Sequence, residues 1–158
     1  METPDPNTAQ DRSNWKNRSG ATVDLTLVGA EHIRQYEQTG GVIGHDWNHT
    51  SCLILHAIGR NTGQTIKKAL IYAPYEDAFV VVGSLAGSPK HPNWYLNLVA
   101  HPDTRVQVWD VIYEVRARNS TGTERQRLWQ LMCTEFPPYA DYQQQTDREI
   151  PVIVLDRR

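Results

Sequence analysis

Cysteine is scarce in this sequence, with only two residues among 158, Cys52 and Cys133. Two cysteines cannot form the disulfide framework that stabilises many small secreted domains. Cys52 falls in an apolar run typical of a strand, and Cys133 falls in a helical pattern. We therefore expect two buried, reduced thiols in a cytoplasmic protein.

Long apolar runs and a strong net charge are also missing. No stretch approaches the roughly 20 apolar residues that a membrane-spanning helix needs. The polar N-terminal residues lack the apolar core of a secretory signal, so we expect none. The formal net charge is −2 and the pI is about 6.3. Nucleic-acid-binding proteins usually carry a cationic excess, and we therefore expect no nucleic-acid partner.

Length and composition predict one globular domain. The chain is 39% hydrophobic and 22% charged, which is typical of folded proteins. A chain of this length can bury about two thirds of its unfolded surface. Residues 1–20 are rich in Asn, Asp, Pro, Ser and Thr, a composition that predicts a flexible tail. Residues 21–158 then form the single domain.

Short apolar runs rich in β-branched residues predict about six strands. The joins between the first three runs are only four to seven residues long, which favours antiparallel neighbours. The final run, IPVIVL, is apolar on both faces, so we expect it to be central in the sheet. The predicted strands are 51–58, 66–73, 78–84, 104–109, 111–119 and 150–155.

Helical signals lie between these strands. Gly40 and Gly41 would end a helix over 29–39, and Pro92 fits the first turn of a helix over 91–100. Thr121 followed by Glu124 resembles a capping box. The helix that follows has an apolar stripe, which consists of Leu128, Leu131, Met132 and Phe136. A short helical turn is predicted over 140–146.

Strands with short joins and inserted helices predict an α+β fold. The strands would be mostly antiparallel, and a sheet that curls into a small barrel removes its exposed edges. The patterns by themselves do not identify the chemistry of such a barrel.

Three segments have residue types that can carry chemistry. The turn 59–64 places Arg60 between two glycines, so it is either a plain hairpin or a cradle for a phosphate or carboxylate. The segment 83–88 is either an ordinary turn or a place where a planar ligand approaches the backbone. Tyr139 has a phenol that can donate a hydrogen bond or a proton, although a structural role is the simpler interpretation.

Other kinds of site find little support. His45 and His49 have the spacing of metal ligands, but no Cys or Glu cluster accompanies them, so no metal is predicted. The sequence lacks the Gly-x-Ser-x-Gly elbow of serine hydrolases, and neither cysteine has the setting of a reactive thiolate. P-loop and dinucleotide-binding fingerprints are absent from the glycine-containing turns.

Three long segments, taken in order, carry a specific family resemblance. They are LILHAIGRNTGQ, VVVGSLAGSPKHPNWYLNLVAHPDTRVQV and PPYADYQQQTDREIPVIVL. With them the chain resembles the deazaflavin-dependent nitroreductase family over roughly residues 30–156. The resemblance implies a split β-barrel of the FMN-binding type. It also implies a reductase that passes hydride from reduced deazaflavin coenzyme F-420 to a quinone, nitroaromatic or activated enone.

The resemblance also implies a position for each part of the site. The phosphate and tail of the coenzyme would lie at Arg60, Asn61 and Thr62. The groove would be lined by Ile66, Lys67, Lys68, Ala69, Leu70, Ile71, Val82, Gly83, Ser84 and Leu85, and covered by Asn93, Trp94, Tyr95, Leu96 and Asn97. Tyr139 and Ser84 match residues that act on the acceptor, and the acceptor pocket would be formed by Phe136, Tyr139 and Tyr142.

The chain departs from the family pattern at three cationic positions. The family commonly has Lys at the position of Asn61, Arg at that of Ile66 and Lys at that of Leu85. Exposed charge pairs contribute only about 0–1 kcal/mol each, but the loss of three weakens the binding of an anionic coenzyme substantially. Candidates for compensation are Lys67, Lys68 and Lys90. Phe136 also replaces a frequent tyrosine.

Two alternatives therefore stay open beside the deazaflavin reductase. One is a non-catalytic barrel that holds an apolar ligand such as a fatty acid or a flavin, and the other is an enzyme that uses FMN. The retained Tyr139, Ser84 and Arg60 favour the deazaflavin enzyme, whereas the lost cations favour the binding protein. For the enzyme we expect a cytoplasmic monomer or homodimer with a small-molecule acceptor, and peripheral membrane contact is one route to quinones.

Overall fold

A computed structural model describes residues 23–158, and the predicted tail over residues 1–20 lies outside them. The strands are β1 (Asp46–Trp47), β2 (Thr50–Ile58), β3 (Thr65–Tyr75), β4 (Ala78–Val82), β5 (Asp103–Val108), β6 (Val111–Asn119) and β7 (Val152–Arg157). The helices are α2 (Gly29–Thr39), α3 (Asn93–Ala100), α4 (Gly122–Glu135) and α5 (Pro138–Gln144), with a 3-10 turn, η1 (Leu85–Gly87).

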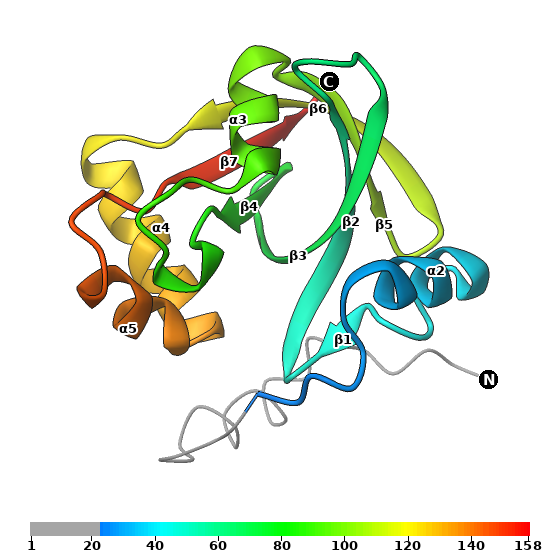
Figure 1. Cartoon of the computed structure of the whole chain (residues 1–158), viewed down its shortest axis with the longest axis horizontal. Helices are drawn as coiled ribbons and strands as arrows, with labels where there is room; N and C mark the ends of the chain where they lie inside the picture. The colour runs from blue at the N-terminus through cyan, green and yellow to red at the C-terminus, as the bar shows by residue number, and fades with distance from the viewer. Residues whose placement is uncertain (1–22) are drawn as a thin grey trace.

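The strands close into an antiparallel barrel with helices on its outside (Figure 1). Their order is β1-β2-β3-β4-β7-β6-β5, and β2 also pairs with β5. This second pairing, between Ile54–His56 and Arg105–Gln107, turns an open sheet into a closed one. Closure removes the unpaired edges that would otherwise promote aggregation. The predicted split-barrel fold with about six antiparallel strands is confirmed.

The strand β7 is central, as predicted, because it pairs with β4 on one side and β6 on the other. Its side chains are buried on both faces. Ile153 and Leu155 lie in the cluster inside the barrel, whereas Val152 and Val154 pack in a second cluster with Leu128 of α4. The continuous apolar run therefore reflects a strand between the barrel interior and a covering helix.

Several predicted boundaries differ from the structure. Strand β4 ends at Val82, two residues early, because the chain turns at Ser84. Helix α3 begins at Asn93, since Pro92 is its extended N-cap, and α5 covers Pro138–Gln144 where a turn over 140–146 was expected. The two-residue strand β1 and the turn η1 were not predicted.

The predicted capping box at the start of α4 is wrong. Thr121 is the N-cap residue, but its side chain makes no capping hydrogen bond. Glu124 instead accepts a hydrogen bond from the Arg118 guanidinium at 2.6 Å and another from the Tyr75 hydroxyl at 3.1 Å. A charge-assisted bond to a guanidinium is stronger than a bond to a neutral backbone amide, which explains the preference.

Both cysteines are free thiols. Cys52 is buried, as expected, whereas Cys133 is only half-buried on α4. Burial raises the pKa of both thiols, which keeps them protonated. No helix within residues 23–158 is both long and apolar enough to cross a membrane.

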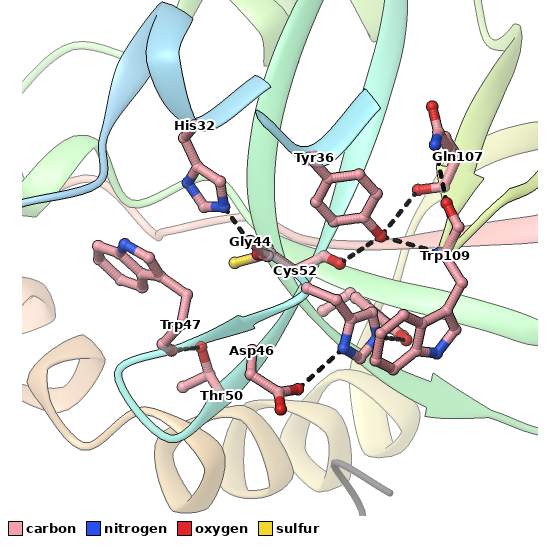
Figure 2. A network of polar contacts seen from close by, with 11 residues as sticks. His32, Tyr36, Gly44, Asp46, Trp47, Thr50, Cys52, Gln107 and Trp109 are labelled. Atoms are coloured by element: carbon pink, nitrogen blue, oxygen red, sulfur yellow. Dashed lines mark hydrogen bonds and ion pairs between the residues drawn. The ribbon is translucent and has the colours of Figure 1, made fainter. Parts of the chain in front are cut away.

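The Tyr36 hydroxyl fastens α2 to the barrel (Figure 2). Tyr36 is fully buried, and its hydroxyl donates to the Cys52 carbonyl at 2.9 Å and accepts from the Trp109 amide at 3.0 Å. Gly41 allows this packing, since a Cβ there would lie 2.9 Å from the Trp109 Cα. One side chain therefore joins α2 to β2 and to the β5–β6 turn.

We expect Tyr36→Phe to lower the free energy of unfolding by about 1–3 kcal/mol, because the Trp109 amide would lose its partner. Urea unfolding measures this change. The control is Tyr75→Phe, which should cost less than about 1 kcal/mol because Glu124 keeps its bond to Arg118. Equal losses in the two variants would contradict the role given to Tyr36.

Candidate active site

A groove of about 500 Å³ opens at the side of the barrel. It lies between α2, the strand β3, the turn after β4 and the pair α4–α5. A cavity of this size suits a small planar ligand. Its lining residues are Val28, Gly29, Ala30, His32, Ile33, Trp47, Cys52, Lys67, Lys68, Ala69, Leu70, Ile71, Val82, Ser84, Leu85, Ala86, Trp94, Phe136, Tyr139 and Tyr142.

Five of the lining rings form a continuous series, which we call the aromatic wall. His32 stacks on Trp47 with ring centroids 6.2 Å apart, and Trp47 stacks on Phe136 at 6.3 Å. Phe136 stacks on Tyr139 at 5.1 Å, and Tyr139 meets Tyr142 edge-on at 6.4 Å. Such a surface favours flat aromatic ligands, which stack or pack edge-on against it.

The Tyr139 side chain is 5% exposed and lies in the middle part of this wall. Its hydroxyl has no hydrogen-bond partner within residues 23–158, yet it is not sealed from solvent, so it opens onto the groove. Burial raises the pKa of Tyr139 well above that of an ordinary tyrosine. The phenol therefore stays protonated and serves as a hydrogen-bond donor.

The turn that carries Ser84 has a strained backbone. Leu85, Ala86 and Gly87 have φ values of 43°, 51° and 79°, in the left-handed region that L-residues rarely adopt. Only glycine fits at position 87, because a Cβ there would lie 2.8 Å from the Tyr142 carbonyl oxygen. Strain of this kind persists where surrounding contacts enforce it, and it is frequent at functional sites.

Arg148 supplies those contacts. Its guanidinium donates to the carbonyl oxygens of Ser84 at 2.7 Å, Ser88 at 2.8 Å and Gly83 at 3.1 Å. It also lies 3.2 Å from His91 Nδ1. No carboxylate within the described residues pairs with Arg148, and each of its three guanidinium nitrogens donates to a carbonyl oxygen of this turn. Sequence reasoning missed Arg148, although it lies in the quoted segment PPYADYQQQTDREIPVIVL.

The structure brings twelve of the predicted site residues to the groove. They are Lys67, Lys68, Ala69, Leu70, Ile71, Val82, Ser84, Leu85, Trp94, Phe136, Tyr139 and Tyr142. Sequence reasoning missed eight lining residues, among them His32 and Trp47, because their segments showed only a short helix and a polar loop. The other six are Val28, Gly29, Ala30, Ile33, Cys52 and Ala86.

Nine predicted coenzyme contacts lie outside the groove lining: Arg60, Asn61, Thr62, Ile66, Gly83, Asn93, Tyr95, Leu96 and Asn97. The β2–β3 hairpin extends past the barrel, and there Ile66 faces Ala57 and approaches Gly59. Tyr95 points to the other side of α3, where its hydroxyl accepts from Asn119 at 2.9 Å. Their contribution to coenzyme binding stays a prediction.

Arg60 is held by α3 through neutral groups. Its guanidinium donates to Asn97 Oδ1 at 2.8 Å, and its backbone amide donates to the same oxygen at 3.1 Å. Asn97 is buried and Arg60 is exposed. Since its partners on α3 are neutral asparagine and backbone oxygens, they do not compensate the positive charge of Arg60.

The lysines near the groove differ in whether a carboxylate pairs with them and whether they line the groove. Lys67 pairs with Glu37 at 2.6 Å, which reduces its attraction for an anion. Lys68 lines the groove, is exposed and has no ion-pair partner within residues 23–158. Lys90 is exposed but does not line the groove. Lys68 is thus the described lysine best placed to replace the cations missing at Asn61, Ile66 and Leu85.

His45, one of the two loop histidines, is held by neighbouring side chains. His45 lies 2.8 Å from the Tyr72 hydroxyl and 3.0 Å from Asp46 Oδ1, and it stacks on Trp109 with centroids 3.7 Å apart. Across residues 23–158 no three His, Cys, Asp or Glu side chains gather as a metal site would require. His45 thus contributes packing and hydrogen bonds to the same junction as Tyr36.

Residues 29–157 match the family of F420H(2)-dependent quinone reductases. The chain belongs to this family. An F420H(2)-dependent quinone reductase of Mycobacterium tuberculosis is 36% identical over 152 residues, which cover 94% of this chain and 99% of the relative. A second relative from that species, named a putative F420H(2)-dependent quinone reductase, is 34% identical over 106 residues and covers 67% of this chain and 89% of the relative.

Solved structures agree with this assignment. The F420-H2 dependent reductase FDR-A has 35% identity and a TM-score of 0.62, with 66% of this chain and 93% of that chain covered. Another, described as a domain-swapped dimer, has 35% identity and a TM-score of 0.66, with 78% and 92% covered. The predicted family, its split-barrel fold and the expected class of enzyme, a deazaflavin-dependent reductase, are confirmed.

We expect Arg148→Lys to lower kcat/KM at least about tenfold, because the single nitrogen of a lysine cannot reach all three carbonyl oxygens that Nε, Nη1 and Nη2 of Arg148 bind separately, and Ser84 would shift. Oxidation of reduced coenzyme F-420 by menadione, followed by absorbance, measures this. The control is Arg125→Lys, since Arg125 donates to the Ile150 carbonyl and lies outside the groove. If the two variants lost activity equally, the assignment of Arg148 to the Ser84 turn would be wrong.

Proposed function

We propose that the protein reduces a small planar acceptor of the quinone type with hydride from reduced coenzyme F-420, in the groove beside Tyr139. The observation that carries this proposal is that the Tyr139 residue and the strained Ser84 turn line the same aromatic-walled cavity. The family supports the reductant and the class of acceptor.

The residues of the groove fit the chemical parts of the coenzyme. The apolar stretch Ala69–Ile71 on β3 and Val82 on β4 suit the flat ring, and the free Lys68 suits the anionic side. Arg60 would bind the phosphate or tail farther along the barrel. When bound, the coenzyme supplies the hydride, so the protein needs only to position the acceptor and stabilise its developing charge.

Tyr139 would act by donating a hydrogen bond to the acceptor oxygen. Negative charge grows on that oxygen during hydride transfer, and a donor already in place stabilises it without reorganisation. Because burial raises the pKa of Tyr139, the phenol keeps its proton across the physiological range. Ser84, whose turn is held by Arg148 and packs against α5, would orient the acceptor from a position beside that helix.

A second candidate is a barrel of the same fold that binds an apolar ligand, or FMN, without using coenzyme F-420. The absence of cations at Asn61, Ile66 and Leu85 favours it, as does the pairing of Lys67 with Glu37. The two candidates differ in coenzyme binding. Fluorescence titration with coenzyme F-420, followed by turnover with menadione, separates them, and no change in either would favour the second candidate.

Tyr139→Phe should lower kcat at least about tenfold and change the Kd of the coenzyme less than about twofold, because a preorganised donor acts mainly on the transition state. Absorbance kinetics with menadione and fluorescence titration measure the two quantities. Tyr113→Phe, on β6 outside the groove, is the matched control. An equal loss of turnover and binding would make Tyr139 a structural residue.

Lys68→Ala should weaken coenzyme binding about three- to fivefold, since one exposed charge pair contributes up to about 1 kcal/mol. The change should fade at high salt, because solvent ions screen exposed charges. Lys90→Ala removes the same charge outside the groove and should leave the Kd unchanged. A Lys90 effect as large as that of Lys68 would argue against a specific contact.

The domain extent, the oligomeric state and the location of the enzyme are also part of this proposal. The single domain over residues 21–158, a monomeric or homodimeric state, and a cytoplasmic protein with peripheral membrane contact all stay hypotheses. The exposed side chains of Val28 and Leu85 at the groove support access for an apolar acceptor.

A further inference from the structure

His32 on α2 is a buried histidine, and one of its two ring nitrogens makes a hydrogen bond to the protein. The side chain is only 4% exposed, and Nε2 lies 2.7 Å from the carbonyl oxygen of Gly44 (Figure 2). A carbonyl oxygen only accepts hydrogen bonds, so Nε2 must carry the hydrogen. In neutral imidazole the other nitrogen, Nδ1, then has a free lone pair.

That second nitrogen opens onto the groove. Nδ1 has no hydrogen-bond partner within residues 23–158, and His32 lines the cavity. Nδ1 is also not among the side-chain atoms of the described residues that are sealed from solvent without a hydrogen-bond partner. In Figure 2 the ring points this nitrogen away from Gly44, on the side of Trp47.

Apolar residues accompany His32 at the groove. His32 stacks on Trp47, and Ile33 and Val28 line the same part of the groove. His32 is the last ring of the aromatic wall, separated from Tyr139 by Trp47 and Phe136. A hydrogen-bonding atom at the far end of an apolar wall fixes the orientation of a ligand and gives specificity.

The His32 ring is held in place by contacts at Nε2 and Cδ2, without a hydrogen bond at Nδ1 from the described residues. Gly44 has φ 107° and lies so close to the ring that a Cβ there would approach His32 Cδ2 to 2.9 Å. This packing and the Nε2 bond fix the ring, and a side chain with a single donor at the Nε2 position would maintain them. The fixed ring holds Nδ1 in the groove with little entropy left to lose on binding.

We propose that His32 is the distal anchor of the acceptor site. Its Nδ1 accepts a hydrogen bond from a hydroxyl or N–H group at the end of a planar acceptor that is remote from the reduced group. The acceptor class is thus a fused or extended aromatic quinone with a donor substituent on its outer ring. This inference rests on the proposed function, since it places the reduced end at Tyr139.

Two substitutions separate the two nitrogens of His32. His32→Gln places a donor near the Nε2 position, so it keeps the bond to Gly44 and removes the atom in the groove. His32→Asn places its amide near the Nδ1 position, so it keeps a polar atom in the groove and loses the bond to Gly44. Thermal unfolding should therefore show a larger loss for His32→Asn than for His32→Gln.

The ligand probes are a naphthoquinone with a hydroxyl group on its benzenoid ring and the methyl ether of that compound. Equilibrium dialysis without coenzyme measures their binding, and turnover with reduced coenzyme F-420 measures their use. The wild type should bind the hydroxyl compound about tenfold more tightly than the ether, the value of one hydrogen bond in an apolar site. His32→Gln should lose this preference, and His32→Asn should keep most of it.

Equal binding of the two compounds by the wild type would overturn the proposal, as would a preference that His32→Gln retains. A wild type that prefers the hydroxyl compound but oxidises no reduced coenzyme would support the anchor and refute the proposed reaction. A wild type that oxidises the coenzyme without preferring the hydroxyl compound would do the reverse. The dialysis and turnover measurements therefore judge the two ideas separately.

Discussion

The pairing of β2 with both β3 and β5 is the constraint on which the rest of the molecule depends. Because β2 has neighbours on both sides, the sheet is closed and its interior is filled by one apolar cluster. The helices can then only lie outside, where α4 and α5 cover β4 and β7 and α2 covers β2 and β3 (Figure 1). The groove is the space that these outer elements leave beside β3.

Two devices keep the groove open and its polar atoms in position. On one side, Arg148 holds the strained turn of Ser84 through three backbone carbonyl oxygens. On the other side, Tyr36 and Gly44 fix α2 and the ring of His32 (Figure 2). Preorganisation of this kind reduces the entropy lost on binding, and it explains how a small apolar site can select the orientation of its ligand.

The two ends of the groove differ in polarity and charge. The deep end of the groove is aromatic, and there burial raises the pKa of Tyr139 and leaves a neutral hydrogen-bond donor. The outer end is exposed and carries Lys68, with Lys67 paired to Glu37. An anionic group is thus favoured only at the mouth, and an uncharged ring is favoured inside.

The sequence alone determined six of the strands, the helices α2, α3 and α4, and the central position of β7, because alternating and helical apolar patterns depend on local geometry. The quoted segments determined the family, and with it Ser84, Tyr139 and the β3 side of the groove. Only the tertiary structure decided that Trp47 and His32 complete the aromatic wall, and that Arg148 holds a turn 64 residues earlier in the chain. It also placed Arg60 and Ile66 outside the groove. Such contacts join segments far apart in sequence, and they form only when the closure of the barrel fixes where each segment lies.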